Sequence, residues 1–285
     1  MKCLNLGCGS RYHPAWTNVD FAPEDPAVLS HDLRRGIPFP DEEFDVVYHS
    51  HVLEHFSRRG ARGFLRECRR VLKPGGTLRV AVPDLELIAK TYLGTLERAA
   101  AGGGQDGGDD YEWMMLELYD QAVRETSGGE MGAYLRRDPL PNKEFVVARV
   151  GIEAERAIES LARSGAARPA PQPDGAPAVR RPTLLGRLRR VLGDASARRE
   201  ALVRRLLGAE YELLELGRFR RGGELHLWMY DRYSLARALT EAGFREARAV
   251  GPAESRIEGW ADFHLDTEPD GAVCKPDSLF MEASK

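Results

Sequence analysis

Two glycines and an aspartate near the start of the chain have the spacing of a nucleoside-binding site. Gly7 and Gly9 follow a short apolar stretch, and Asp20 ends the next one, eleven residues after Gly9. Because a glycine carries no Cβ atom, the backbone at these positions can approach a ligand closely. A carboxylate at the end of the second strand can accept hydrogen bonds from a ribose diol. The third glycine of a dinucleotide fingerprint is missing, so these residues alone leave a nucleotide site and an ordinary loop both open.

Two histidines and a glutamate form a second group that could carry out chemistry. His51, Glu54 and His55 spell the His-x-x-Glu-His pattern of some zinc peptidases. A zinc site would also need a third ligand and a helix that presents both histidines to a cleft. The string begins instead where an apolar stretch ends, so we expect no metal ion there.

The elements around these residues alternate between strand and helix patterns. A helical period covers residues 52–72, and strands are expected at residues 2–6, 17–20, 28–32, 44–49 and 77–82. Such alternation predicts an α/β fold with a parallel, doubly wound sheet, which binds ligands at the carboxyl ends of its strands. Only about ten residues separate the first two strands, fewer than a helical crossover needs. We therefore expect the first helix to be stunted or replaced by a loop.

The alternation stops after the fifth strand and returns late in the chain. Residues 85–224 are mostly helical in pattern, and residues 164–182, rich in Ala, Pro and Arg, are expected to form a flexible linker. A helix near 233–242 and strands at 246–250 and 278–282 then restore the α/β pattern. The sequence thus predicts one α/β core, residues 1–84 and 225–285, with a helical lid at 85–224 inserted after strand five.

Composition limits the class of protein. The chain has 285 residues, of which 42% are hydrophobic, and a net charge of −3, so nothing in its overall charge favours nucleic acid or anionic lipid. No apolar run approaches the length of a membrane span, and a core-type strand stands where a signal peptide would begin. The four cysteines form no CxxC pair, which favours a reducing, cytoplasmic location. The oligomeric state stays open, a homodimer included.

Taken together, the order of these segments resembles the class I S-adenosylmethionine-dependent methyltransferases, and within them the broad methyltransferase type 11 group. The resemblance covers roughly residues 1–84 and 225–285. It implies a Rossmann-like methyltransferase fold, a parallel sheet with an antiparallel last strand, carrying a large helical insertion after strand five. The segments that carry it are residues 4–10, Asp20, 31–33, 44–47, 51–55, 70–76 and 242–244.

The resemblance implies S-adenosylmethionine (SAM) as cofactor, with S-adenosylhomocysteine as product. Gly7 and Gly9 would pass under its methionine part, and Asp20 would hold the ribose hydroxyl groups. Asp32 would bind the adenine amino group while Leu33 packs on the ring. The remaining cofactor contacts are expected from Asn5, Cys8, Phe21 and the backbone near Ser50. The stunted first helix and Ser10, in place of a small glycine, depart from the family pattern.

Candidate catalytic and acceptor-binding residues follow from the same resemblance. His51 would lie near the reactive methyl group and is a candidate general base, with a structural role as the alternative. His55 is a second candidate, for which packing is the alternative. Tyr119 and Asp120 of the insertion could bind the acceptor or simply form an amphipathic face. His226, Trp228 and Tyr230 could line its pocket or catalyse, or they could pack at a hinge.

The expected activity is methyl transfer to a small molecule, a sugar or secondary metabolite, at oxygen first and nitrogen next. His49, Ser50 and His51 stand where enzymes that methylate bases and amides carry an Asn/Asp-Pro-Pro-aromatic string, which disfavours a nucleic-acid base. Residues 180–205 hold nine arginines and two acids, so a phosphorylated or acidic acceptor is plausible. Two alternatives remain: an RNA- or protein-modifying enzyme that docks through residues 180–205, and a SAM-binding protein that does not methylate.

Overall fold

The core of the protein is one twisted seven-stranded sheet. The computed structural model describes residues 1–102, 104–166 and 195–285. The strand order is β3-β2-β1-β4-β5-β7-β6, and β7 alone runs antiparallel to its neighbours. This confirms the expected Rossmann-like methyltransferase fold with an antiparallel last strand. The strands are β1 Cys3–Leu6, β2 Thr17–Asp20, β3 Leu29–Ser30, β4 Phe44–Ser50, β5 Leu72–Pro83, β6 Arg245–Val250 and β7 Ser278–Ser284.

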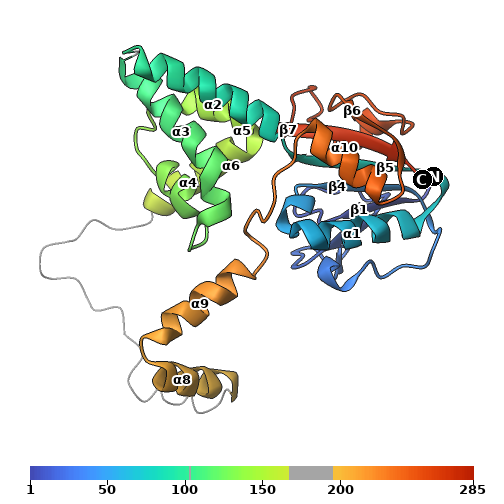
Figure 1. The fold of residues 1–285 in the computed structure, drawn as a ribbon, viewed down its shortest axis with the longest axis horizontal. Coiled ribbons are helices and arrows are strands. Elements are labelled where there is room, and N and C mark those ends of the chain that lie inside the picture. Colours follow the sequence, from blue (N-terminus) through green and yellow to red (C-terminus); the bar gives the residue numbers. More distant parts are fainter. Residues whose placement is uncertain (103, 167–194) are drawn as a thin grey trace, which may run out of the picture.

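Two helices, α1 (Arg58–Val71) and α10 (Arg232–Glu241), cover one face of the sheet (Figure 1). The buried residues of α1 recur every three or four positions, so they form one apolar stripe. Alternate strand residues point toward this stripe because side chains of a strand alternate between faces. The buried residues on this side include Leu4, Leu6, Phe64, Leu65, Leu78, Val80, Leu235 and Leu239.

Side-chain caps fix where these helices begin. Ser57 accepts the N–H of Gly60 at 3.2 Å and starts α1. Asp231 and Ser234 form a capping box at the start of α10. The helix expected over residues 52–72 is therefore divided: a 3-10 turn, η2 (Leu53–His55), precedes the Ser57 cap. The strand expected at 28–32 is also shorter, because Asp32 caps the 3-10 turn η1 (Leu33–Arg35).

The opposite face of the sheet is covered by a long connection. Residues 7–16, all described, join β1 to β2 through turns and loops, so the expected loss of the first helix is confirmed. Residues 251–277, between β6 and β7, pack there and include the 3-10 turn η3 (Trp260–Phe263). Trp260 makes edge-to-face contacts with Trp16 and Tyr48, at centroid distances of 6.0 and 5.1 Å. An aromatic cluster thus takes the place of a helix.

Arg79 of β5 fastens this connection to the sheet. Its fully buried guanidinium pairs with Asp266 at 2.8 Å and Glu282 at 2.9 Å, and lies 4.3 Å from the Trp260 ring centroid. The remaining N–H groups donate to the carbonyl oxygens of Gly251, Pro252 and Glu254. All five donors of the guanidinium are thereby used, which a lysine could not reproduce.

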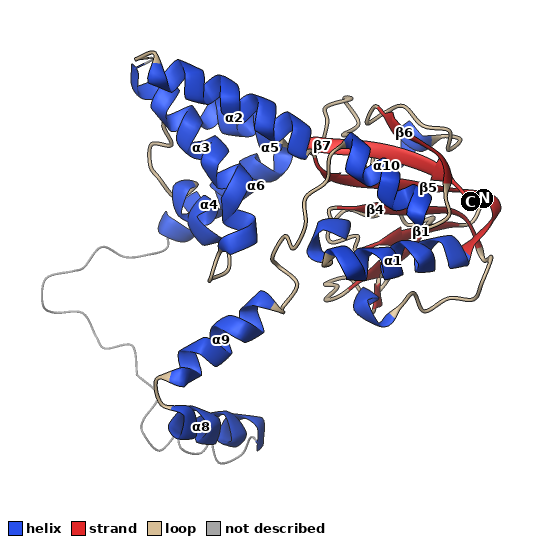
Figure 2. Cartoon of the chain, viewed as in Figure 1, coloured by secondary structure: helices blue, strands red, loops and turns tan. Residues whose placement is uncertain are grey.

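The described residues between β5 and α10 are mostly helical (Figure 2). Helices α2 to α6 enclose a core of their own, built on Ile88, Trp113, Met114, Tyr134, Val146 and Ala154. Helices α8 and α9 form a second group, joined by a 2.5 Å ion pair between Glu200 and Arg218. The helices are α2 Leu85–Ala100, α3 Gly104–Val123, α4 Gly129–Tyr134, α5 Lys143–Val150, α6 Ile152–Ala166, α8 Ala195–Leu207 and α9 Glu210–Arg220.

These separate cores support the domain division made from the sequence, which we keep as a proposal. The linker expected at 164–182, apart from its first three residues in α6, lies outside the described residues, as do residues 180–194 of the arginine-rich segment. Among the residues that are described, no helix combines the length and the apolar character needed to cross a lipid bilayer.

Replacing Arg79 by alanine should greatly destabilise the fold. The change leaves Asp266 and Glu282 buried without their shared cation, which typically costs about 3–5 kcal/mol. The control is Arg62→Ala, which breaks the exposed 3.0 Å pair with Glu241 and should cost less than about 1 kcal/mol. Chemical unfolding measures both, and a loss below about 1 kcal/mol for Arg79→Ala would contradict the assigned role.

Candidate functional site

The turn after β1 is a bare backbone cradle. Gly7 and Gly9 have φ angles of +66° and +53°, in the left-handed region that favours glycine. Gly7 N–H donates to the Val19 carbonyl at 2.8 Å, and the Asp20 carboxylate accepts the N–H of Gly9 at 2.8 Å. A Cβ atom on Gly9 would meet nothing within 4 Å. Open space therefore lies in front of a turn that Asp20 holds in place.

A cavity of about 430 Å³ opens beside this turn; we call it the Asp20 cavity. Five of the residues expected to hold the cofactor line it: Gly7, Asp20, Phe21, Asp32 and Leu33. The opposite wall is formed by residues 220–223 at the end of α9, with Leu225 and Leu227. Carboxylates beside an apolar wall are what a nucleoside needs for its hydroxyl groups and its base.

Asp32 is held by Arg34 in this cavity. Its carboxylate accepts the backbone N–H of Arg34 at 3.0 Å and the guanidinium at 2.8 and 3.0 Å. The neighbouring guanidinium lowers the pKa of Asp32 below its usual value. Arg34 also donates to the Arg221 carbonyl at 2.8 Å, which links this wall to α9. A carboxylate has about four acceptor positions, so these hydrogen bonds leave room for one more. The expected bond to an adenine amino group stays a prediction.

A second cavity, of about 240 Å³, lies between the glycine turn and the connection that precedes β7; we call it the Lys275 cavity. Asn5, Cys8 and Ser50 line it from the strand ends, as do Arg11 and Lys275. The two cations are paired, Arg11 with Glu268 at 2.5 Å and Lys275 with Glu153 of α6 at 3.2 Å. Cationic groups beside a glycine turn suit a ligand that carries a carboxylate.

A third, smaller cavity of about 80 Å³ lies between the end of β5 and the helical insertion; we call it the Asp277 cavity. The insertion contributes Glu117, Gln121 and Glu153, and the connection before β7 contributes Asp277. Burial raises the pKa of Asp277 to about 7, with a further contribution from Glu117. A neutral carboxyl group at this position can donate as well as accept a hydrogen bond.

His51 lines all three cavities. Its φ of +53° is unusual for a residue other than glycine. Nε2 lies 2.8 Å from the Ser278 hydroxyl, and Nδ1 lies 3.6 Å from a carboxylate oxygen of Glu54. Burial lowers the pKa of His51 well below its usual value, and Lys275 lowers it further. The ring is therefore neutral near pH 7 and can accept a hydrogen bond.

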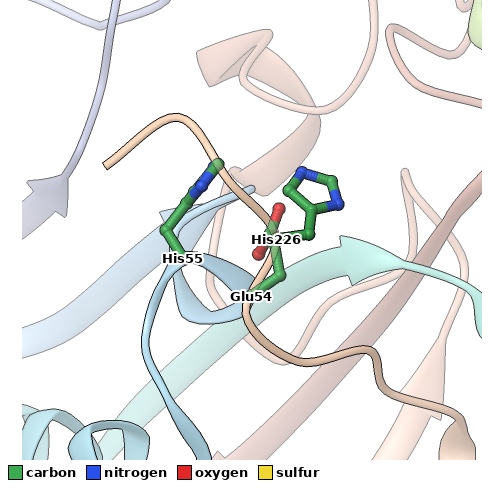
Figure 3. A group of neighbouring side chains, drawn as sticks. All are labelled: Glu54, His55 and His226. Atoms are coloured by element: carbon green, nitrogen blue, oxygen red, sulfur yellow. The ribbon is translucent and has the colours of Figure 1, made fainter. Parts of the chain in front are cut away.

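The structure brings His226 to Glu54 and His55 (Figure 3). Glu54 and His55 belong to η2. His226 lies in residues 221–231, which lead from α9 to α10 and which we call the return segment. The rings of His55 and His226 are 5.0 Å apart between centroids. Burial raises the pKa of Glu54 to about 8 and lowers that of His226 to about 3. His51 precedes η2, so it does not share a helix with His55 as a zinc peptidase would require.

Four candidate residues lie away from the three cavities around His51. Asp120 is buried, where it pairs with Arg124 at 2.7 Å and caps a turn by accepting the N–H of Glu130. The other three are Tyr119, exposed on α3; Trp228, stacked under Arg58 at 5.2 Å; and Tyr230, buried in the sheet core. Their surroundings are those of structural residues.

Sequence reasoning did not identify Lys275, Asp277, Glu153 or the Arg220–Arg221 end of α9 as neighbours of the glycine turn. These residues stand in segments without a strand or helix period, or in a different helix far along the chain. The family motifs stop short of them. Only the folded connection before β7 and the insertion bring them to the strand ends.

Comparison with known proteins supports the interpretation of the first part of the chain. Residues 4–80 match the family described as "Methyltransferase domain". A probable S-adenosylmethionine-dependent methyltransferase of Mycolicibacterium smegmatis is 34% identical over an alignment that covers 28% of this chain and 37% of that protein. The chain thus spans little more than a third of that curated relative's length.

Solved structures give more distant matches. A SAM-dependent methyltransferase from Archaeoglobus fulgidus aligns over 100% of this chain and 86% of its own, with 10% identity and a TM-score of 0.36. A putative methyltransferase in complex with the Haloferax volcanii Trm112 activator aligns over 31% of this chain and 47% of its own, with 23% identity and a TM-score of 0.26.

Adding a methyl group to Gly7 should harm the fold more than adding one to Gly9. Both residues have a left-handed backbone conformation, so alanine should lower the free energy of unfolding by about 1–2 kcal/mol at either position. At Gly7 the new Cβ atom would also overlap the Val52 side chain, and overpacking adds about 1–3 kcal/mol. Chemical unfolding of Gly7→Ala and Gly9→Ala measures the difference. The double variant Gly7→Ala/Val52→Ala should recover part of it, and equal losses in the two single variants would contradict the close approach.

Proposed function

We propose that this chain, which carries a class I S-adenosylmethionine-dependent methyltransferase domain, transfers a methyl group from SAM to a small molecule. The observation that carries the proposal is the position of His51. It lies where the Asp20 cavity, the Lys275 cavity and the Asp277 cavity adjoin. A cofactor laid across the first two would thus have its sulfonium group near their junction, beside the third cavity, which the insertion lines.

The residues of the glycine turn fit SAM. The open space at Gly9 and the left-handed turn provide a cradle without side chains. Asp20 and Asp32 would hold the ribose and adenine polar groups, with Phe21 and Leu33 against the base. Arg11 and Lys275 would face the methionine carboxylate. When bound, SAM supplies an activated methyl group: the acceptor lone pair forms the new bond, and the electrons of the broken carbon–sulfur bond stay on sulfur.

The chain's own contribution is placement of the acceptor. Positioning two reactants in line supplies a large share of the acceleration in such a transfer. If Nε2 of the neutral His51 donates to Ser278, the Nδ1 lone pair is left to accept a hydrogen bond from an acceptor hydroxyl group and so orient its oxygen. Ser278 fixes the ring through the 2.8 Å contact to Nε2.

The lining of the Asp277 cavity supports a polar acceptor of small size. It offers Gln121, Asp277 and the ion pair of Glu153 with Lys275, which suit a molecule rich in hydroxyl or amino groups. A sugar or secondary metabolite methylated at oxygen remains our first proposal, with nitrogen next. Helices α3 and α6 close this cavity, so the insertion would exclude water and select the acceptor.

A screen with SAM and candidate acceptors tests these statements against the alternatives. Formation of S-adenosylhomocysteine with sugars, phosphorylated sugars or amines supports the proposal. Turnover only with RNA or protein, weakened steeply by salt, would favour docking through residues 180–205. SAM binding without turnover on any acceptor would favour a protein that does not methylate. We also propose a cytoplasmic location, supported by four cysteines that are free and buried.

Removing the Asp20 carboxylate should weaken SAM binding. Loss of the acceptor for the ribose hydroxyl groups costs about 1–3 kcal/mol, measured by calorimetry on Asp20→Ala. Asp20→Asn keeps an oxygen for the N–H of Gly9 and so separates ribose binding from turn geometry. The control is Asp25→Ala, because Asp25 caps a neighbouring loop at Ala27. Unchanged SAM affinity in both Asp20 variants would contradict the assignment.

Replacing His51 by asparagine should lower kcat while leaving SAM affinity nearly unchanged. Asparagine tolerates a left-handed backbone but cannot act as a base, so a fall of about 100-fold or more is expected where a proton must be accepted. His264→Asn is the matched control, since His264 has a φ of +50° and is exposed. An equal loss of SAM affinity and turnover would show that His51 only supports the fold.

A further inference from the structure

The segment that returns from the insertion meets η2 at a group of three potential metal ligands. One ligand atom each of Glu54, His55 and His226 lies within 4.8 Å of the other two. In a tetrahedral site with bonds of about 2.0–2.2 Å, ligand atoms stand roughly 3–3.5 Å apart. Shifts of about an ångström in these ligand atoms would therefore bring them to coordination distance from one ion. Figure 3 shows the three side chains on the two adjoining segments.

The carboxylate of Glu54 has no partner of its own. It is fully buried, and within the described residues neither of its oxygens has a hydrogen-bond partner. Nδ1 of the neutral His51 ring lies 3.6 Å from one of these oxygens. A buried carboxylate is costly unless it is paired or coordinates a metal. Two imidazole rings beside it provide donors of the kind that complete such a site.

The surroundings hold the ligands in place before any ion binds. Nδ1 of His55 lies 3.1 Å from the Leu225 carbonyl, so it carries the proton and leaves the Nε2 lone pair free, as in metal-ligating histidines. The carbonyl of Glu54 accepts the N–H groups of Leu227 at 2.7 Å and Trp228 at 3.2 Å. These backbone bonds fix the distance between η2 and the return segment.

We propose that Glu54, His55 and His226 bind one divalent transition-metal ion of the zinc type. Two imidazole nitrogens with one carboxylate suit Zn²⁺ and its neighbours, whereas Mg²⁺ and Ca²⁺ prefer all-oxygen sites. From the sequence we expected no metal ion, because the His51-x-x-Glu54-His55 string begins where an apolar stretch ends and a zinc site would also need a third ligand. The fold supplies that ligand from His226 and leaves His51 outside the set.

Such an ion would fasten the return segment to η2. His226 stands directly after the lining residue Leu225 of the Asp20 cavity, and His55 lines the same cavity. Coordination across η2 and the return segment would fix this wall and, through Glu54, the surroundings of His51. The proposal does not depend on methyl transfer, since the ligands are defined without cofactor or acceptor.

Calorimetry with zinc chloride tests the site on tag-free protein that has been dialysed against a chelator. Wild-type protein should bind one equivalent, and Glu54→Gln and His226→Gln should each weaken binding by about 100-fold or more. His264→Asn should match the wild type. Substitution with Co²⁺ should give the visible absorption bands of a tetrahedral nitrogen and oxygen site.

Thermal melting separates loss of the site from loss of the fold. Zinc should raise the melting temperature of the wild type and of His264→Asn, but not that of Glu54→Gln. Without zinc, Glu54→Gln should melt no lower than the wild type, because glutamine has nearly the same size and the buried carboxyl group has no hydrogen bond to lose. Absence of a saturable site in the wild type, or unchanged affinity in both ligand variants, would overturn the proposal.

Discussion

The buried guanidinium of Arg79 is the constraint on which the rest of the structure depends. Its five donors reach Glu282 of β7 and, in the long connection of residues 251–277, the carboxylate of Asp266 and three carbonyl groups. A buried charge in this position is tolerated only when it is fully paired, so the pairing fixes the position of the connection on the sheet. It lies on the sheet face where the helix between β1 and β2 is missing, and Trp260 and Tyr48 complete the cover. The connection that the ion-pair network holds thus covers the part of the sheet that the short β1–β2 crossover leaves without a helix.

The long connection also contributes residues to the candidate site. The same connection continues from Asp266 to Lys275 and Asp277, and ends at Ser278, which contacts His51. The glycine turn and Asp20 come from the first strands, so the site joins two ends of the sequence across one edge of the sheet. The insertion contributes Glu153 and the end of α9. Cofactor and acceptor would therefore meet residues of three separate segments.

The first half of the core could be predicted from the sequence because its signals are local. The Gly7–Gly9 turn, Asp20, the stripe of α1 and the missing helix all follow from spacing within a few dozen residues. Lys275, Asp277 and the neighbourhood of Glu54 could not be predicted, because their positions depend on Arg79 and on the return segment. Tyr230 and Asp120 each have a suitable side chain in a suitable region, but packing surrounds Tyr230 and a capping interaction holds Asp120, so their roles in a site stay predictions. Polar chemistry near a motif is therefore weaker guidance than the path of the backbone.

The place of β7 has a consequence for how the molecule is made. This strand lies between β5 and β6, and Glu282 reaches Arg79 over 203 residues of chain. A nascent chain emerging from the ribosome exposes the open edge of β5 long before its partner exists. The α2–α6 bundle, whose contacts are more local, can form meanwhile, whereas pairing over such a separation is slow. Until β7 and the connection before it are made, the sheet is unfinished and Arg79 lacks its carboxylate partners, which exposes the chain to aggregation in this interval.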